Sequence, residues 1–312
     1  MLRRLLIGSG LHAARATAIL GASAAGTIVY AASSSCDSCM SRPILFFSDL
    51  DQTLVGGDEA GLGEWCTYWQ EEERAKHGSI LCFNTGRCIK DYETELKHLL
   101  PVPDVLISGD GLEIRFYDPV QRALKLDEEW ERRMRRYWDE SGLRARVLAS
   151  MQPHDAGLIH GLNDVNNSPP HGEARWAITV TGGARKAQAL ALQLENELHG
   201  AIHCYAMKGW DAQGISYVVC ALPKISGKAN AARYVQERLQ LPDHACVAAG
   251  DSENDATMLS TPYTFVAVSN ASPGLVEALD AAEATERHFR AGKAYASGVV
   301  EGLRHVRARL VV

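Results

Sequence analysis

Short apolar runs alternate with amphipathic segments along most of the chain. Each apolar run predicts a strand, and each segment with apolar residues at helical spacing predicts a helix. Strands that alternate with helices predict an α/β fold, in which a parallel sheet is joined by right-handed crossovers. The predicted strands are 44–48, 79–83, 105–107, 112–117, 245–249 and 265–268, and the predicted helices are 61–77, 89–100, 227–239 and 255–259.

The alternation changes in the middle of the chain, between residues 118 and 211. Here the pattern predicts a charged helix, a polar Pro-rich loop, a strand, a long helix and two more strands, without regular alternation. Such a run suits a small α+β insert beside the main sheet. Its predicted helices are 128–138 and 184–198, and its predicted strands are 176–181, 202–207 and 215–222.

The composition is that of an ordinary soluble globular protein, with 312 residues, 46% hydrophobic and 22% charged. The net charge of −6 does not favour a nucleic-acid partner. Eight cysteines are scattered through the chain and suggest reduced, buried thiols. Cys36 and Cys39 form a lone CxxC without the second ligand pair that a zinc site needs.

The first residues differ from the rest of the chain. Residues 1–35 hold Arg3, Arg4 and Arg15 and no acidic residue, which is typical of an organelle transit peptide. We therefore expect a leader over 1–41 and a chloroplast or mitochondrial location, with a secretory signal or a cytoplasmic location as alternatives. The apolar part, 16–32, is short and diluted for a membrane span, and the sequence does not indicate an oligomeric state.

Four polar patches each follow a predicted strand or begin a predicted helix. In an open parallel sheet, ligands bind at the carboxyl ends of the strands, so we expect these patches to meet. Each alone has an ordinary explanation as a surface turn or a helix cap. The patches are Asp49, Asp51 and Thr53; Asn84, Thr85, Gly86 and Arg87; Lys228; and Asp251, Ser252, Asn254 and Asp255.

These residue types suit phosphoryl transfer. One aspartate attacks phosphorus and forms an acyl phosphate, and a second one protonates the leaving oxygen and then activates water. A tight turn directly after Asp49 is required to bring Asp51 back to the site instead of continuing along the strand. Mg²⁺ tolerates clustered carboxylates because its charge neutralises them, and Thr85 and Lys228 would hold the phosphate oxygens.

The segments DLDQT and NTGR, the separate Lys228 and the segment GDSEND resemble the four motifs of the haloacid dehalogenase superfamily of aspartate-based phosphatases. Within it, SDLDQTLVG, VLISGDGLEI, KANAARYVQ, GDSENDATML and ATERHFRAGKAYASGVVEGL resemble the sucrose-phosphate phosphatase family. The resemblance covers about 42–312. It implies a Rossmann-like core in two parts, 42–117 and 212–312, with an inserted α/β cap domain at 118–211 that selects the substrate.

The resemblance also implies a role for each motif residue. Asp49 is the nucleophile and Asp51 the general acid and base. Thr85, Gly86 and Lys228 bind phosphate, while Asp49, the carbonyl of Asp51 and Asp251 bind Mg²⁺. Ser252, Asn254 and Asp255 support the lysine and the metal. Arg87, Glu113 and Lys208 are candidates for substrate contact; a surface ion pair, a solvated strand position and a packing role are their respective alternatives.

The chain departs from the family pattern at Glu253, Ala177, Cys220 and the enlarged loop 158–173. Because the cap selects the sugar, these changes weaken the assignment of sucrose more than that of a phosphatase. The function predicted is a Mg²⁺-dependent phosphatase acting on a sugar phosphate, similar to sucrose 6-phosphate. The alternatives are another glycosyl phosphate, a phosphomutase, for which Gln52 is atypical, and a non-catalytic organelle subunit, which the complete set of motif residues argues against.

Overall fold

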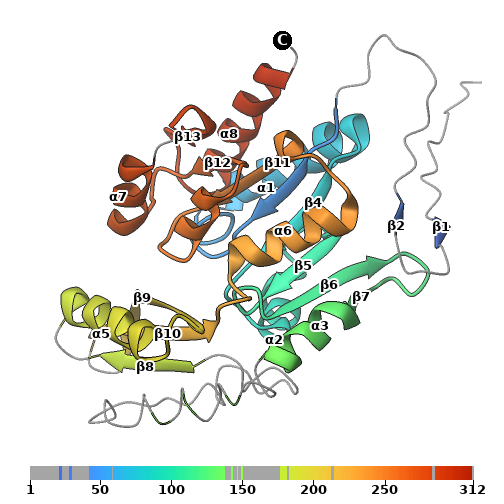
Figure 1. Ribbon diagram of the computed structural model, residues 1–312. Helices are drawn as coiled ribbons and strands as arrows, with labels where there is room; N and C mark the ends of the chain where they lie inside the picture. The colour runs from blue at the N-terminus through green and yellow to red at the C-terminus, as the bar shows by residue number, and fades with distance from the viewer. Residues whose placement is uncertain are drawn as a thin grey trace, which may run out of the picture.

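The computed structural model contains a large sheet with helices on both faces and a second, smaller sheet (Figure 1). The predicted leader and the loop 158–173 lie outside the described residues, except for two short strands of the leader. Among the described helices, none combines the length and the apolar composition needed to span a bilayer. The described residues are 42–57, 59–137, 176–180, 183–211, 214–282 and 285–310, with β1 (Gly21–Ala22), β2 (Ile28–Val29), Gly142, Arg146 and Ala149.

The large sheet has the strand order β13-β12-β11-β3-β4-β5-β6-β7. The strands from β13 to β5 are parallel, which confirms the predicted α/β class. The expectation of a parallel sheet is wrong for β6, which pairs antiparallel with β5; β7, which was not predicted as a strand, pairs antiparallel with β6 at the edge of the sheet. The strands are β3 (Leu45–Ser48), β4 (Ile80–Asn84), β5 (Val105–Ser108), β6 (Glu113–Asp118), β7 (Ala123–Leu126), β11 (Cys246–Gly250), β12 (Thr264–Ala267) and β13 (His288–Arg290).

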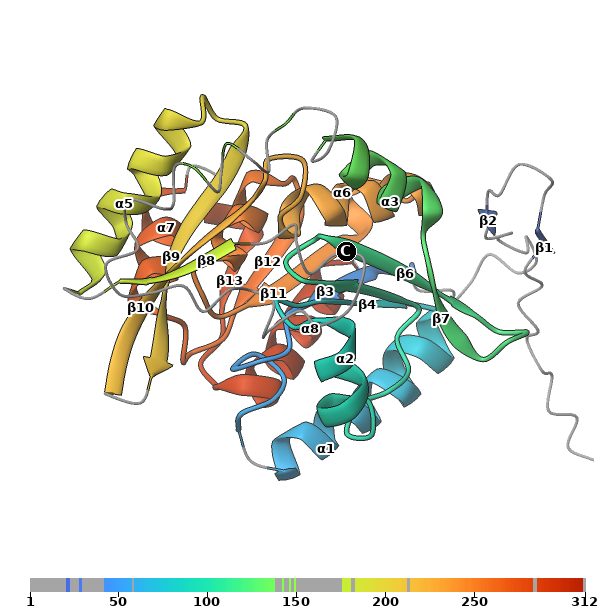
Figure 2. The same cartoon turned by 90° about the horizontal axis from the view of Figure 1, so that it is seen from below.

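Two hydrophobic clusters cover the two faces of this sheet. Neighbouring strand residues point to opposite faces, so Phe46 packs with Trp65 and Trp69 while Phe47 belongs to the cluster that contains Trp130. Figure 2 shows α3 and α6 on one side of the sheet and α1 and α2 on the other. The helices are α1 (Glu59–Tyr68), η1 (Trp69–Lys76), α2 (Ile89–Asp91), η2 (Tyr92–Leu96), α3 (Glu128–Arg135), α6 (Lys228–Leu239), η5 (Asp243–Ala245), η6 (Asp255–Ser260), α7 (Pro273–Ala281), η7 (Thr285–Arg287) and α8 (Tyr295–Leu310).

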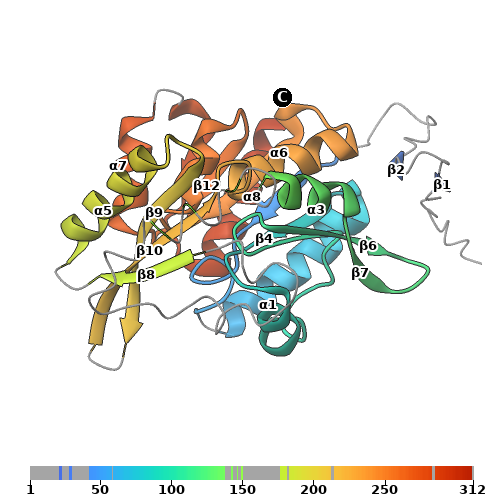
Figure 3. The same cartoon turned by 60° about the horizontal axis from the view of Figure 1, so that its bottom comes forward.

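The smaller sheet forms a unit of its own with one helix. Its antiparallel strands have the order β8-β10-β9, and the helix packs on β9 and β10. Figures 1 and 3 show this group beside the ends of the core strands, and we call it the small-sheet unit. It consists of β8 (Trp176–Val180), α5 (Ala184–Glu197), β9 (Ile202–Asp211) and β10 (Gly214–Pro223).

The sheets divide the chain differently from the predicted insert at 118–211. The strand β7 lies in the large sheet although it falls inside that range, and β10 lies in the small sheet although it falls outside. The apolar pattern predicts the β10 segment as a strand but misses the short β7, and it carries no information on the partners of either. The partners are set by the hairpins that join β6 to β7 and β9 to β10.

A buried ion pair joins the first and last helices of the core. Glu73 in η1 is fully buried, and its carboxylate accepts hydrogen bonds from Arg307 of α8, with Nε to Oε1 at 2.9 Å. Ser79 donates to Oε2 at 2.9 Å and Tyr68 to Oε1 at 3.1 Å. The carboxylate is therefore well satisfied, and only Arg307 supplies it with a full positive charge in this cluster.

Replacing Arg307 with Ala should lower the free energy of unfolding by about 3–5 kcal/mol, because a buried carboxylate is left without its cation. Urea denaturation measures the loss. The control is Lys76→Ala, which breaks the exposed pair with Glu72 and should cost only about 0.3–0.5 kcal/mol. Equal losses in the two variants would contradict a special role for the buried pair.

Candidate active site

The chain turns sharply directly after β3. Asp49 continues the strand, its backbone N–H donating to Ala249 of β11 at 3.0 Å. The carbonyl of Leu50 then accepts from the N–H groups of Leu54 and Val55 at 2.9 and 2.8 Å, and Gln52 takes a left-handed φ of 61°. This is the tight turn that the sequence required after Asp49. It leaves the Asp49 side chain buried at the carboxyl end of the strand.

A buried lysine lies between two aspartates at this point. The ammonium of Lys228, at the start of α6, is 2.8 Å from Oδ1 of Asp49 and 2.7 Å from Oδ1 of Asp255. Lys228 is 1% exposed, so these ion pairs are shielded from water. The first and fourth sequence patches therefore meet through the third, as the strand order predicts.

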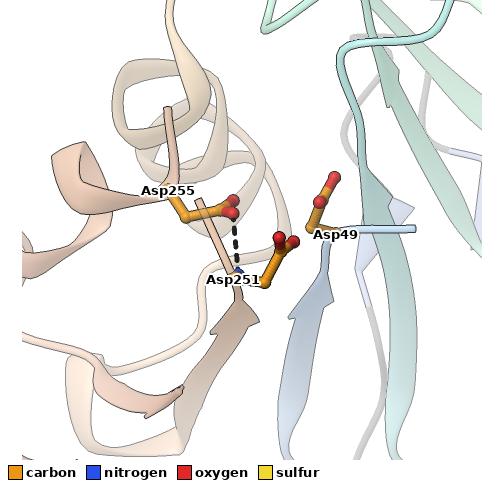
Figure 4. A group of neighbouring side chains, drawn as sticks. All are labelled: Asp49, Asp251 and Asp255. Carbon is orange, nitrogen blue, oxygen red and sulfur yellow. Dashed lines mark hydrogen bonds between the residues drawn. The ribbon is translucent and has the colours of Figure 1, made fainter. Parts of the chain in front are cut away.

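Asp251 completes a cluster of three carboxylates. It follows β11, and its Oδ1 accepts a hydrogen bond from Thr53 at 2.8 Å. Figure 4 shows Asp49 and Asp251 at the ends of adjacent strands with Asp255 beside them. One carboxylate oxygen from each residue lies within 4.8 Å of the others, which is a spacing that allows one metal ion to be shared.

The electrostatics of the cluster favour an additional cation. Burial raises the pKa of Asp49, an effect that Lys228 opposes and that Asp255 and Asp251 reinforce. Burial, with the nearby Asp255, raises the pKa of Asp251 to about 7. Burial alone would lower the pKa of Lys228, but the surrounding carboxylates outweigh it and the net shift is upward. One ammonium does not neutralise three carboxylates, and oxygen ligands of this kind suit Mg²⁺.

Asp255 has less freedom to bind a ligand than the other two acids. Its Oδ1 is bound to Lys228, and its Oδ2 accepts from the backbone N–H groups of Asp251 and Ser252, both at 3.1 Å. A Cβ at Gly250 would lie 2.3 Å from the Asp255 carboxyl carbon, so only glycine fits before this loop. The structure thus places Asp255 where it holds both the lysine and the loop that carries Asp251.

The second sequence patch lies beside this cluster at the end of β4. The backbone N–H of Thr85 donates to Ile107 at 3.0 Å, and its hydroxyl accepts from the N–H of Arg87 at 3.1 Å. Asn84 donates to the carbonyl of Lys228 at 3.1 Å, which ties this loop to α6. Thr85 is fully buried, and the neighbouring Gly86 is partly buried.

Asp51 does not point into the lysine cluster but forms a bidentate ion pair with Arg87. Nε and Nη2 of Arg87 each lie 2.7 Å from one of its carboxylate oxygens, and Arg87 also pairs with Glu95. The Asp51 side chain is 44% exposed, so it remains accessible. Arg87 was a candidate for substrate contact, with a surface ion pair as the alternative. The structure shows an ion pair, and its partner is Asp51, the predicted general acid and base.

Ser252 and Asn254 lead to a residue that the sequence analysis did not select. The Ser252 hydroxyl donates to Oδ1 of Asn254 at 2.6 Å, and the amide of Asn254 donates to Oδ1 of Asp110 at 3.0 Å. Asp110 is 1% exposed and lies between Gly109 and Gly111. The sequence does contain a signal for this residue, the Gly-Asp-Gly that follows a predicted strand. Glycines on both sides of an acid are typical of a loop that needs left-handed backbone angles.

Three other sequence candidates are placed differently. Glu113 lies in β6 and forms an ion pair with Arg115. Lys208 lies in β9 opposite Tyr217, and its side chain is outside the described part of the structure. Glu253 packs against the first turn of α7, where a Cβ at Gly274 would lie 2.6 Å from its Oε1, so it does not join the three aspartates.

The α/β core, the inserted small-sheet unit and the aspartate–lysine site define a phosphatase of the haloacid dehalogenase type. The family model described as sucrose-6F-phosphate phosphohydrolase matches residues 42–307. The chain therefore belongs to the sucrose-6F-phosphate phosphohydrolase family, and the resemblance seen in its motifs is confirmed.

The comparisons with individual proteins agree on fold and class. The chain is 26% identical over 273 residues to a mannosylfructose-phosphate phosphatase from Agrobacterium fabrum, a match covering 84% of this chain and 96% of that protein. The sucrose-phosphatase of Synechocystis, solved with sucrose and phosphate, has a TM-score of 0.67 and 24% identity over 85% of this chain and 98% of its own. A haloacid dehalogenase-like hydrolase from Bacillus subtilis has a TM-score of 0.57 and 17% sequence identity. The match covers 86% of this chain and 93% of that protein.

The raised pKa of Asp251 predicts a pH-dependent stability for the metal-free protein. The pKa is about 7 when folded against an ordinary 3.8, so the folded state binds this proton more tightly than the unfolded state. The stabilisation from Asp251 is present below about pH 4 and is lost as the pH rises to about 7. Asp251→Asn should therefore gain stability relative to the wild type over this interval, by at most about 4 kcal/mol.

Urea unfolding of both proteins in EDTA, from about pH 4 to about pH 8, measures this difference. Asp280→Asn, which removes one exposed carboxylate, is the control for the loss of a surface charge. A difference that stays flat or falls with pH would show that burial does not hold the proton on Asp251.

Proposed function

We propose that this phosphatase is a Mg²⁺-dependent phosphomonoesterase that hydrolyses a disaccharide phosphate, such as sucrose 6-phosphate, through an aspartyl-phosphate intermediate. The observation that carries the proposal is the buried Asp49 carboxylate held by Lys228 beside Asp251 at the carboxyl ends of β3 and β11. A buried carboxylate with a fixed cation beside it is a nucleophile placed next to a phosphate-binding charge.

In the first step, a carboxylate oxygen of Asp49 attacks phosphorus and the bond from phosphorus to the sugar oxygen breaks. The leaving sugar oxygen takes a proton from Asp51. In the second step, Asp51 removes a proton from water, whose oxygen attacks phosphorus and frees the Asp49 carboxylate and inorganic phosphate. Thr85 and Lys228 hold the phosphate oxygens throughout. The pair between Asp51 and Arg87 has to open, or to shift, for the proton transfer to occur.

The residues that would hold Mg²⁺ are Asp49, Asp251 and the backbone carbonyl of Asp51. The cluster suits a divalent cation because its acids outnumber its single lysine and because Asp251 has a raised pKa. When bound, Mg²⁺ would neutralise the carboxylates and the substrate phosphate together.

The membership of the family and the name of the Agrobacterium relative support a sugar phosphate of disaccharide size, with mannosylfructose phosphate as the second candidate. The small-sheet unit corresponds to the predicted substrate-selecting cap. It carries Cys220 in β10, at a position where the family resemblance implies an acid, and this difference is a reason to compare several sugars.

Phosphate release should be measured for the protein from residue 36 onward with Mg²⁺ and a panel of sugar phosphates. The panel holds sucrose 6-phosphate, mannosylfructose phosphate, trehalose 6-phosphate and glucose 6-phosphate. One disaccharide phosphate should be turned over far faster than the rest, EDTA should abolish the activity, and Asp49→Asn should lower kcat by about 10³-fold or more. Equal, slow turnover of all sugars would reject a dedicated disaccharide phosphatase.

Asp51→Asn should separate the two steps. The loss of a general acid and base lowers kcat for a sugar phosphate by about 10²–10⁴-fold. With p-nitrophenyl phosphate the leaving group needs no proton, so the first step should persist and the second should fail. Stopped-flow absorbance should then show a burst of one p-nitrophenol per protein followed by slow turnover. If Asp51→Asn gives no burst while the wild type turns over, Asp51 is not the base of the second step.

A further inference from the structure

The connection between β5 and β6 places one acidic side chain in a buried position. Gly109, Asp110 and Gly111 all have left-handed φ angles, of 60°, 55° and 89°. Aspartate tolerates this region better than most residues, but three in succession are held only where the surroundings determine them. A Cβ at Gly111 would lie 2.6 Å from the carbonyl oxygen of Gly227, so the loop is pressed against the start of α6.

Asp110 contacts three of the four segments that carry the site. Its N–H donates to the carbonyl of Thr85 at 3.0 Å, and its carbonyl accepts from the N–H of Gly227 at 2.9 Å. Its Oδ1 accepts from Asn254 at 3.0 Å. A Cβ at Gly86 would lie 3.2 Å from both carboxylate oxygens. The loop of Thr85 and Gly86, the start of α6 and the loop from Asp251 to Asn254 therefore all contact Asp110.

The other oxygen of Asp110 is bound from the small-sheet unit. The hydroxyl of Tyr205, which lies in β9 opposite Cys220, donates to Oδ2 of Asp110. Tyr205 is 9% exposed and Asp110 is 1% exposed, so this hydrogen bond is shielded from water. The loss of a hydrogen bond by a buried carboxyl group is costly, because water cannot replace the lost partner.

The small-sheet unit packs on the core, because buried Leu222 of β10 belongs to the same hydrophobic cluster as Ala229 and Ala231 of α6. A pocket of about 310 Å³ lies at the same boundary, lined by Ile202 and His203 of β9, Asn230 of α6 and Thr257 of η6. A second tyrosine also crosses to the unit, since the hydroxyl of Tyr137, beyond α3, donates to the carbonyl of Ala201 at 2.7 Å. Both bonds are donated by a tyrosine hydroxyl, but Tyr137 donates to a backbone carbonyl, whereas Tyr205 donates to the side chain of Asp110 and so reaches the catalytic loops.

We propose that Asp110 is a positioning residue that couples the small-sheet unit to the catalytic loops through the Tyr205 hydroxyl. The proposal rests on the proposed function in that the unit covers the sugar of the substrate. When the unit moves away, the buried Asp110 carboxyl loses its hydrogen bond from Tyr205, which is unfavourable. The bond therefore favours the closed arrangement, in which the small-sheet unit lies against the core and Tyr205 is bonded to Asp110. A substrate that contacts the unit then binds to catalytic loops that are already in place.

Steady-state kinetics of Tyr205→Phe tests this coupling, because the substitution removes only the hydroxyl. The value of kcat/KM for the preferred disaccharide phosphate should fall about 10-fold more than that for p-nitrophenyl phosphate, mainly through KM. The matched control is Tyr137→Phe, which removes a hydroxyl donor of the same kind and should leave the ratio of the two values unaltered. The proposal is overturned if the ratio of kcat/KM for the disaccharide phosphate to kcat/KM for p-nitrophenyl phosphate is the same in Tyr205→Phe and in Tyr137→Phe.

Hydrogen–deuterium exchange without substrate separates this inference from the proposed function. In Tyr205→Phe the amides at 85–87 and 251–255 should exchange faster than in the wild type, whereas in Tyr137→Phe they should not. If no sugar phosphate is hydrolysed but exchange differs in this way, the coupling stands and the assigned substrate is wrong. Unchanged exchange in Tyr205→Phe would refute the coupling whatever the substrate.

Discussion

The interaction on which the site depends is the buried contact of Lys228 with Asp49 and Asp255. A lysine with 1% exposure keeps its charge only because two carboxylates lie within 2.8 Å of it. The same contact fixes the start of α6 against the ends of β3 and β11. The charge that would bind phosphate is therefore also the charge that holds three segments of the chain together.

Two carboxylates of the same motif are divided by their surroundings. Asp49 is buried beside a lysine, whereas Asp51, two residues later, is half-exposed and paired with Arg87. The left-handed turn at Gln52 makes this division possible, because an extended chain would have kept these two side chains, two residues apart, on the same face of the sheet. One acid is thereby suited to attack and the other to exchange protons with solvent.

Much of this arrangement is predictable from the chain itself. The buried runs such as 44–48 and 245–249 identified the parallel strands, and the polar residues after them identified the site because parallel strands end at one edge. Pairing was harder to predict. The pattern did not predict the short β7 as a strand, and it predicted β10 as a strand but ended the insert at 211, before this strand. Asp110 was missed since its importance lies in contacts with distant segments, which no local pattern encodes.

The residues around the ion pair of Glu73 and Arg307 also bring the start of the core next to its last helix. Arg307 donates to the carbonyl of Arg42 as well as to Glu73, so the first described residue of the core and the last helix are adjacent. Residue 42 precedes β3, at the end of the strands opposite Asp49. The start of the core and the last turns of α8 therefore lie side by side, at the end of the sheet opposite the three carboxylates.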